Sequence, residues 1–120
     1  MKYKLLTTNF NMTPEVSREI DETMNKLEKF IDRPIQAWVE VGKTTEHHQK
    51  GEIYRAEIQI SLPGNSVRST AVRETIFEAI NEAEDDIERR LKKYKGKKMD
   101  RIRKGARFLK RLINRRRHEK

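Results

Sequence analysis

The amino-acid sequence predicts an α+β fold in which a four-stranded sheet carries two helices packed on one face. Four segments alternate apolar and polar residues with the period of a strand, and two longer segments repeat apolar residues at spacings of three and four, as helices do. These segments follow one another in the order β-α-β-β-β-α. Because each helix has one apolar stripe to bury, both helices belong on the same face of the sheet, in a two-layer domain.

The first predicted strand and helix lie at the N-terminus. Residues 2–8 alternate as a short strand does. Thr13 and Pro14 are typical of the N-cap and the first position of a helix, which continues to about Asp32 before Pro34 stops it. The apolar stripe of this helix contains Val16, Ile20, Met24, Leu27 and Ile31.

Three further strands follow. Residues 35–41 alternate again, whereas residues 43–51 have no periodicity and are predicted to form a mobile loop. Residues 54–62 show the clearest alternation in the chain. Pro63-Gly64 suits the centre of a type II turn, after which residues 65–72 return as the fourth strand.

The second helix is predicted to end near Gly96. Its apolar stripe contains Ile76, Phe77, Ile80, Ala83, Ile87, Leu91 and Tyr94. The chain is therefore predicted to divide into an α+β domain over residues 1–95 and a basic tail over residues 96–120, disordered or partly helical when free. A weak stripe in the tail, interrupted by Gly105, contains Met99, Ile102, Ala106, Leu109 and Ile113.

Positive charge is concentrated at the C-terminal end. Of the 32 residues from Arg89 to Lys120, 17 are Lys or Arg and two are acidic, a net charge of +15. The residues before Arg89 contain 11 basic and 17 acidic side chains, a net charge of −6. A cation block this dense gains free energy by displacing counterions from a polyanion, which favours a nucleic acid as the partner.

Composition excludes several classes of protein. The chain has no cysteine, so disulfides and thiolate chemistry are ruled out. The N-terminus lacks the apolar run of a secretory signal, and no stretch reaches transmembrane length. We therefore expect a soluble, cytoplasmic protein.

Charge changes sign along the second helix, where a run of acids from Glu74 to Glu88 gives way to Arg89, Arg90, Lys92, Lys93 and Lys95. Acids at the start and bases at the end of a helix also suit its dipole. The dipole does not explain the tail, however, where cations continue far beyond the predicted helix. A polyanionic partner explains both segments.

A weaker set of cations comes from other elements. Lys26, Lys29 and Arg33 lie at the end of the first helix, and Arg55 and Arg68 lie on outward strand positions. Scattered surface cations usually serve solubility. These residues contribute to a binding groove only if they share a face with the cations of the second helix.

No constellation indicates catalysis or a cofactor. His47 and His48 are adjacent in the predicted loop and lack a third ligand at usable spacing, so no metal site is expected. Neither a nucleophile with a base nor a phosphate-cradling glycine motif stands out. Trp38, on the polar side of its strand, either stacks on a base or covers core residues at the sheet edge. We expect no enzyme, no cofactor and no small-molecule substrate.

Four segments in the right order resemble the ribosome hibernation-promoting factors, a family that includes the ribosome-associated inhibitor. These are MTPEVSREI at 12–20, NKLEKF at 25–30, LPG at 62–64 and IFEAINEAEDDIERRLKKYK at 76–95. The resemblance covers residues 1–95. It implies a protein that binds the decoding channel of the small ribosomal subunit through rRNA and inhibits translation by excluding mRNA and tRNA. Off the ribosome, we expect a monomer.

The resemblance also implies which cations contact rRNA. Those at the ends of the two helices correspond to the family's contacts: Lys26, Lys29, Arg89, Arg90, Lys92 and Lys93. The basic run extends these predicted contacts to Lys95, Lys97 and Lys98. Possible additional contacts are Arg33, Arg55, Arg68, Arg101, Arg103 and Lys104.

The chain departs from the family in several places, and its basic tail over residues 96–120 is unusual for a short form of the family. Glu84 and Asp86 stand where the family has apolar residues and a lysine, which predicts weaker rRNA contacts there or contacts moved toward the tail.

Two alternative functions stay open. A general double-stranded RNA-binding module would present lysines at the start of its second helix, where this chain has Arg73 followed by acids. A lipid or protein adaptor acting through the tail would need a stronger apolar stripe, so we expect no membrane partner.

Overall fold

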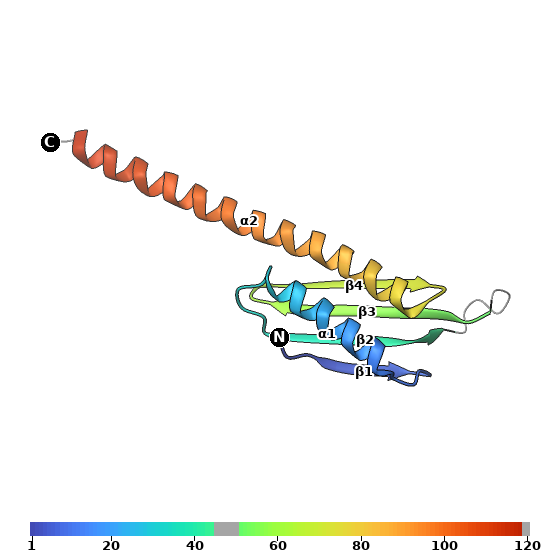
Figure 1. Cartoon of the computed structure of the whole chain (residues 1–120). Helices are drawn as coiled ribbons and strands as arrows, with labels where there is room; N and C mark the ends of the chain where they lie inside the picture. The colour runs from blue at the N-terminus through green and yellow to red at the C-terminus, as the bar shows by residue number, and fades with distance from the viewer. Residues whose placement is uncertain (45–50, 119–120) are drawn as a thin grey trace.

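The computed structural model describes residues 1–44 and 51–118, without the side chains of residues 98 and 114–118. Figure 1 shows a sheet with two helices on one face, one of which extends far beyond it. The elements are β1 (Lys4–Thr8), α1 (Pro14–Glu28), β2 (Gln36–Thr44), β3 (Ile53–Leu62), β4 (Asn65–Arg73) and α2 (Ile76–His118). The predicted α+β class and element order are confirmed.

The four strands lie in the order β1-β2-β3-β4. β1 pairs with β2 in parallel, and the other neighbours pair antiparallel. A parallel pair needs a crossover connection, which α1 supplies. β3 and β4 form a hairpin whose turn contains Gly64 with φ 73°, the positive value that the predicted turn requires.

Several predicted boundaries are wrong by a few residues. α1 ends at Glu28 instead of about Asp32, because the Phe30 N–H donates to the Leu27 carbonyl oxygen at 3.0 Å and tightens the chain into a turn. Lys43 and Thr44, predicted as loop, are the last residues of β2. The rest of that loop, including His47 and His48, lies largely outside the described residues.

The hydrophobic core lies between the sheet and the helices. α2 packs on β3 and β4 and lies beside α1. The largest fully buried side chains come from every layer: Ile20, Met24, Leu27, Val41, Ile58, Ile60, Ile80, Ile87 and Leu91. Phe77, assigned to the stripe of the second helix, is instead exposed.

A glycine sets how closely β1 approaches β2. Gly42 lies opposite Thr8 in the parallel pair, and a Cβ atom built on Gly42 would lie 2.3 Å from the Thr8 carbonyl oxygen. Real Cβ atoms do not approach a backbone oxygen so closely. Only glycine therefore fits this position without moving β1.

The prediction that the second helix ends near Gly96 is wrong. α2 continues without a break to His118, through both Gly96 and Gly105. Leu91 is the last buried side chain, and the Tyr94 hydroxyl donates to the Pro63 carbonyl oxygen at 2.9 Å. We call residues 96–118 the extension. The division into a domain and a basic tail at residue 95 stays a prediction.

The helix continues for a physical reason. Lys, Arg, Leu and Met dominate the extension, and these residues are strong helix formers. A single glycine inside a helix costs only about 1 kcal/mol relative to alanine, and no proline follows Pro63. Every described side chain beyond Tyr94 is exposed.

The two acids that depart from the family pattern hold α2 in place. Glu84 is buried, accepts a hydrogen bond from the Thr23 hydroxyl at 3.3 Å and pairs with Lys26 Nζ at 3.5 Å, which links α2 to α1. Asp86 accepts from the Ser69 hydroxyl of β4 and pairs with Arg90 at 3.1 Å. These two partners hold the pKa of Asp86 below its ordinary value.

We predict that Gly42→Ala lowers the free energy of unfolding by about 1–3 kcal/mol, because the added methyl group forces β1 away from β2. Urea denaturation followed by circular dichroism measures the change. Gly105→Ala is the matched control, since its Cβ meets open space in a helix that alanine favours, and it should leave the domain at least as stable as before. Equal midpoints for Gly42→Ala and the unaltered chain would contradict the close approach.

The low pKa of Asp86 predicts a stability difference that depends on pH. Because its pKa is lower in the folded state, Asp86 stabilises the fold above the unfolded-state pKa of about 4, and this stabilisation is lost as pH falls through the lower folded pKa. Asp86→Asn should therefore be less stable than the unaltered chain at pH 7, and the difference should shrink below about pH 4. Denaturant unfolding at a series of pH values checks this. A difference that is constant with pH would show that the charge on Asp86 is not responsible.

Candidate nucleic-acid interface

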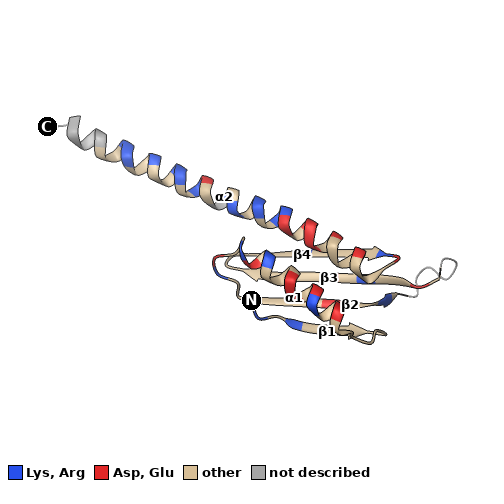
Figure 2. Cartoon of the chain, in the orientation of Figure 1, with Lys and Arg blue, Asp and Glu red and all other residues tan. Residues whose placement is uncertain are grey.

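Four cations lie on the last turns of α2 that still pack against the rest of the domain. Arg89, Arg90, Lys92 and Lys93 are exposed. Figure 2 shows the change from acidic to basic residues along the helix at this point. Ile87, just before these cations, and Leu91, among them, are buried and fix the rotation of the helix, so the cations project outward.

The acids near these cations leave them accessible. Asp86 pairs with Arg89 at 3.4 Å, and Glu88 pairs with Lys92 at 3.5 Å. The guanidinium of Arg89 and the ammonium of Lys92 belong to side chains that remain 74% and 62% exposed. Such exposed pairs contribute at most about 1 kcal/mol, so a phosphate competes easily for the cations.

The end of α1 adjoins these residues. Lys26 pairs across the helix boundary with Glu84 of α2, and Lys92 Nζ lies 5.5 Å from the centre of the Phe30 ring. Lys29, the exposed C-cap of α1, lies between Lys26 and Phe30 in the chain. The two helix ends, with their exposed cations, therefore adjoin in the helix layer. We call this set the ridge: Lys26, Lys29, Arg89, Arg90, Lys92 and Lys93.

Arg33 lies near the ridge. It lines a hollow at the end of the domain together with Phe30, Tyr94 and Lys95. This hollow forms where α2 leaves the β3–β4 turn. Arg33 and Lys95 therefore belong to the same end of the molecule as the ridge.

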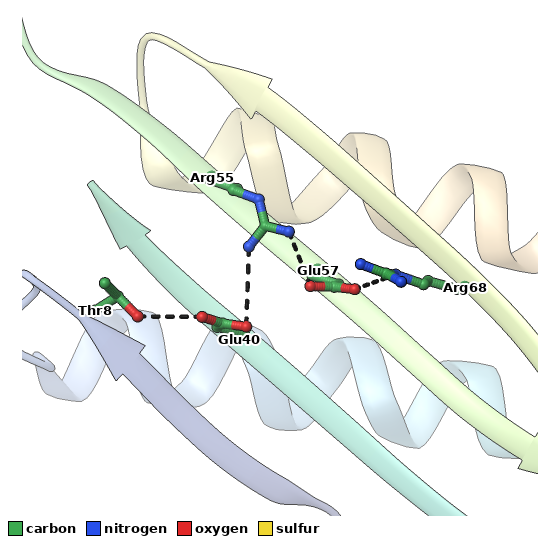
Figure 3. A network of polar contacts seen from close by, with 5 residues as sticks. All are labelled: Thr8, Glu40, Arg55, Glu57 and Arg68. Carbon is green, nitrogen blue, oxygen red and sulfur yellow. Dashed lines mark hydrogen bonds and ion pairs between the residues drawn. The ribbon is translucent and has the colours of Figure 1, made fainter. Parts of the chain in front are cut away.

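Arg55 and Arg68 lie elsewhere. Both are on the face of the sheet opposite the helices, in the network drawn in Figure 3. Arg55 pairs with Glu57 at 2.9 Å and with Glu40 at 3.9 Å, and Arg68 also pairs with Glu57. The structure separates these two cations from the ridge and gives each an acidic partner.

Trp38 lies on the same outer face. It is partly buried on β2, paired in register with Lys4 and Gln59. β2 is an interior strand, so the expectation that Trp38 lies at the sheet edge is wrong. The alternation that placed it opposite the core is confirmed.

The cations of the extension continue from the ridge. Lys95, Lys97, Arg101, Arg103 and Lys104 are exposed on α2, and Lys98 belongs to the same helix. Sequence reasoning did not select Arg107, Lys110 and Arg111 as contacts, although they too are exposed. The helical spacing of these residues was the available signal, and the expected end near Gly96 concealed it.

Two further searches concern the described residues only. Across residues 1–44 and 51–118, no group of three or more His, Cys, Asp or Glu side chains is arranged to hold a metal ion. Within the same ranges, no helix combines the length and the apolar character needed to cross a bilayer.

Relatives of known name share this domain. The chain is 26% identical over 97 residues to the ribosome hibernation promotion factor of Bacillus subtilis (strain 168), which covers 81% of this chain and 50% of the relative. The factor of the same name from Deinococcus radiodurans is 26% identical over 98 residues, with the same coverage. The chain thus spans about half the length of the curated relatives it matches.

Solved structures share the fold. The Thermus thermophilus Protein Y N-terminal domain matches with a TM-score of 0.66 and 28% identity, over 77% of this chain and 96% of that chain. A ribosomal subunit interface protein from Coxiella burnetii matches with a TM-score of 0.63 and 15% identity, over 80% of this chain and 99% of that chain. The second likeness shows the fold alone.

The family is established by a match that covers most of the chain. Residues 4–99 match the family model described as sigma 54 modulation protein / S30EA ribosomal protein. The match spans both helices of the domain and the whole ridge. Together with the relatives above, it confirms the family resemblance inferred from the sequence. The chain belongs to the sigma 54 modulation protein / S30EA ribosomal protein family.

Proposed function

We propose that this protein is a ribosome hibernation factor. In this proposal the domain binds rRNA in the decoding channel of the small ribosomal subunit and inhibits translation by excluding mRNA and tRNA. It acts by occupancy instead of catalysis, in the cytoplasm, and is a monomer off the ribosome. The observation that carries the proposal is the exposed ridge, formed at the adjoining ends of α1 and α2 in a domain of this family.

The physics of the ridge supports a phosphate-rich partner. Guanidinium and ammonium groups bind phosphate oxygens by charge-assisted hydrogen bonds and release condensed counterions from the nucleic acid. The ridge cations lie on helices that are held by the core, so little backbone freedom is lost on binding. Exclusion of a ligand requires only that a stably folded body occupy the same space.

The acids within α2 do not oppose this role. Glu84 is buried between the helices, and Asp86 accepts from Ser69 on its inner side. Their charges are balanced by Lys26, Arg89 and Arg90 within the domain. The expected weakening of rRNA contacts at these two positions stays a prediction.

The alternative is a general double-stranded RNA-binding module. Its lysines would stand at the start of the second helix. Here Arg73 precedes that helix, and its guanidinium pairs with Glu82 through hydrogen bonds of 2.7 and 3.0 Å. The start of the helix thus offers one arginine among the acids Glu74, Glu78 and Glu82 in place of a lysine cluster, which favours the ribosome over free duplex RNA as the main partner.

We predict that reversing three ridge cations, Arg89, Lys92 and Lys93, to glutamate abolishes inhibition of translation. The variant should bind purified small subunits at least about tenfold more weakly, since loss of a single strong phosphate contact is worth roughly 1–2 kcal/mol. Sedimentation with subunits and an in vitro translation assay measure the two effects. Thermal unfolding should be nearly unchanged, because these side chains are exposed.

The matched control reverses three exposed cations away from the ridge: Lys2, Lys4 and Arg18. This variant has the same change in net charge and should retain most of the binding and inhibition. Equal loss in both variants would show that net charge alone is responsible. Retained inhibition in the ridge variant, with an unchanged melting curve, would show that another face binds. Equal affinity of the unaltered chain for free duplex RNA and for subunits would favour the alternative module.

A further inference from the structure

The cations of the ridge continue along one side of the extension. Six basic residues recur at spacings of four, four, seven, three and four, and all are exposed. They are Arg89, Lys93, Lys97, Lys104, Arg107 and Arg111. At 3.6 residues per turn these side chains fall within an arc of about 80° on a single continuous helix. We call them the cationic row.

The cationic row is long and unobstructed. At 1.5 Å per residue it spans about 33 Å. Figure 2 shows basic residues recurring along α2 well beyond the sheet. α2 packs on β3, β4 and α1, and every described side chain beyond Tyr94 is exposed.

Cations outside the cationic row and the exposed Phe108 flank the row, and one side of the extension is apolar. Apolar side chains at spacings of three and four occupy another side of the helix: Met99, Ile102, Ala106, Leu109 and Ile113. A helix that needed cations only for solubility would not require them to be aligned with those of the domain. The helix dipole acts only over the last turn, so it does not account for a row of this length.

We propose that the cationic row is a second RNA-binding surface, whose partner is the phosphate backbone of double-helical RNA. This inference rests on the proposed function and extends it beyond the ridge. A straight helix holds its charges at fixed separations, and a double-helical backbone presents phosphates in a similarly fixed array. A flexible single strand would lose conformational freedom to match the same array. The row is therefore selective for helical RNA without reading its sequence.

One acidic residue provides an internal test. Asp100 falls on the same side of the helix, between Lys97 and Lys104, and is exposed. Its carboxylate lies where a phosphate would pass and repels it. Removing this charge should strengthen binding if the row contacts the backbone.

The first experiment compares Asp100→Asn with Glu78→Gln in the full chain. Both changes raise the net charge by one, but Glu78 lies near the start of α2, away from the row. We expect Asp100→Asn to tighten binding to an RNA duplex about threefold or more, with a smaller gain for a single strand of the same length. Glu78→Gln should change either affinity by less than about twofold. An equal effect of the two changes would overturn the proposal.

The second experiment removes charge from the row. The triple variant Lys104→Gln, Arg107→Gln, Arg111→Gln should reduce the slope of log affinity against log salt for duplex RNA by about 2–3, at roughly 0.9 per contact. The control neutralises three extension cations outside the row: Arg101, Arg103 and Lys110. It should reduce the slope by at most about half as much. Equal reductions would show that the charge acts without direction and would overturn the proposal.

The apolar side must be tested separately. Ile102→Gln with Leu109→Gln should leave duplex binding unchanged. Two results would assign the extension to another partner and overturn the proposal. One is loss of RNA binding in this variant. The other is that the unaltered chain binds anionic phospholipid vesicles more tightly than duplex RNA and that this variant loses the vesicle binding. Small-subunit binding measured in the same variants separates the two hypotheses. The ridge variant also removes Arg89 and Lys93 from the row, whereas the row variants leave every ridge cation in place. Row variants that lose duplex binding and keep small-subunit binding therefore test the row alone.

Discussion

The burial of one face of α2 on β3 and β4 determines how the rest of the molecule is presented. Ile80, Ile87 and Leu91 are almost completely buried and fix the rotation of the helix about its axis. The residues on the opposite side of the helix therefore project outward, and in the last turns of the domain several of these residues, such as Arg89 and Lys93, are basic. Packing of α1 beside α2 then adds Lys26 and Lys29 to the same layer. The apolar contacts of α2 with the sheet thus determine where the cations of the ridge are exposed.

The sheet has two faces with different chemistry. Its inner face supplies the core, whereas its outer face carries Glu40, Glu57, Arg55 and Arg68 in a network that neutralises itself. Charges that are paired in this way across strands stabilise the pairing register and leave little net field. Among the described residues, positive charge is therefore concentrated at the helix ends and in the extension, where an anionic partner gains most from it.

Local periodicity was enough to predict the fold, since each helix and strand buries one face and repeats its apolar residues accordingly. The same reasoning placed Arg55 and Arg68 on the outward face. It did not reveal their acidic partners, because Glu40 lies on a neighbouring strand and the register between strands is set by long-range packing. The end of α2 was misjudged because Gly96 suggested a stop, although no partner packs there and the surrounding residues favour a helix. The ridge was recognisable because its cations are close in sequence within each helix. Its assembly from both helices required the contacts of Glu84 and Phe30.

The hydrogen bond from the Tyr94 hydroxyl to the carbonyl oxygen of Pro63 holds α2 at the β3–β4 turn, where the helix leaves the domain. The part of α2 from Tyr94 to Ile113 is about 28 Å long, so a tilt of 10° at Tyr94 displaces its far end by roughly 5 Å. A small adjustment in the packing of one aromatic ring is thereby amplified into a movement comparable to one helical turn. The β3–β4 turn, which lies beside Arg33 and Lys95, is therefore the place in the domain where a change in packing would move the extension most.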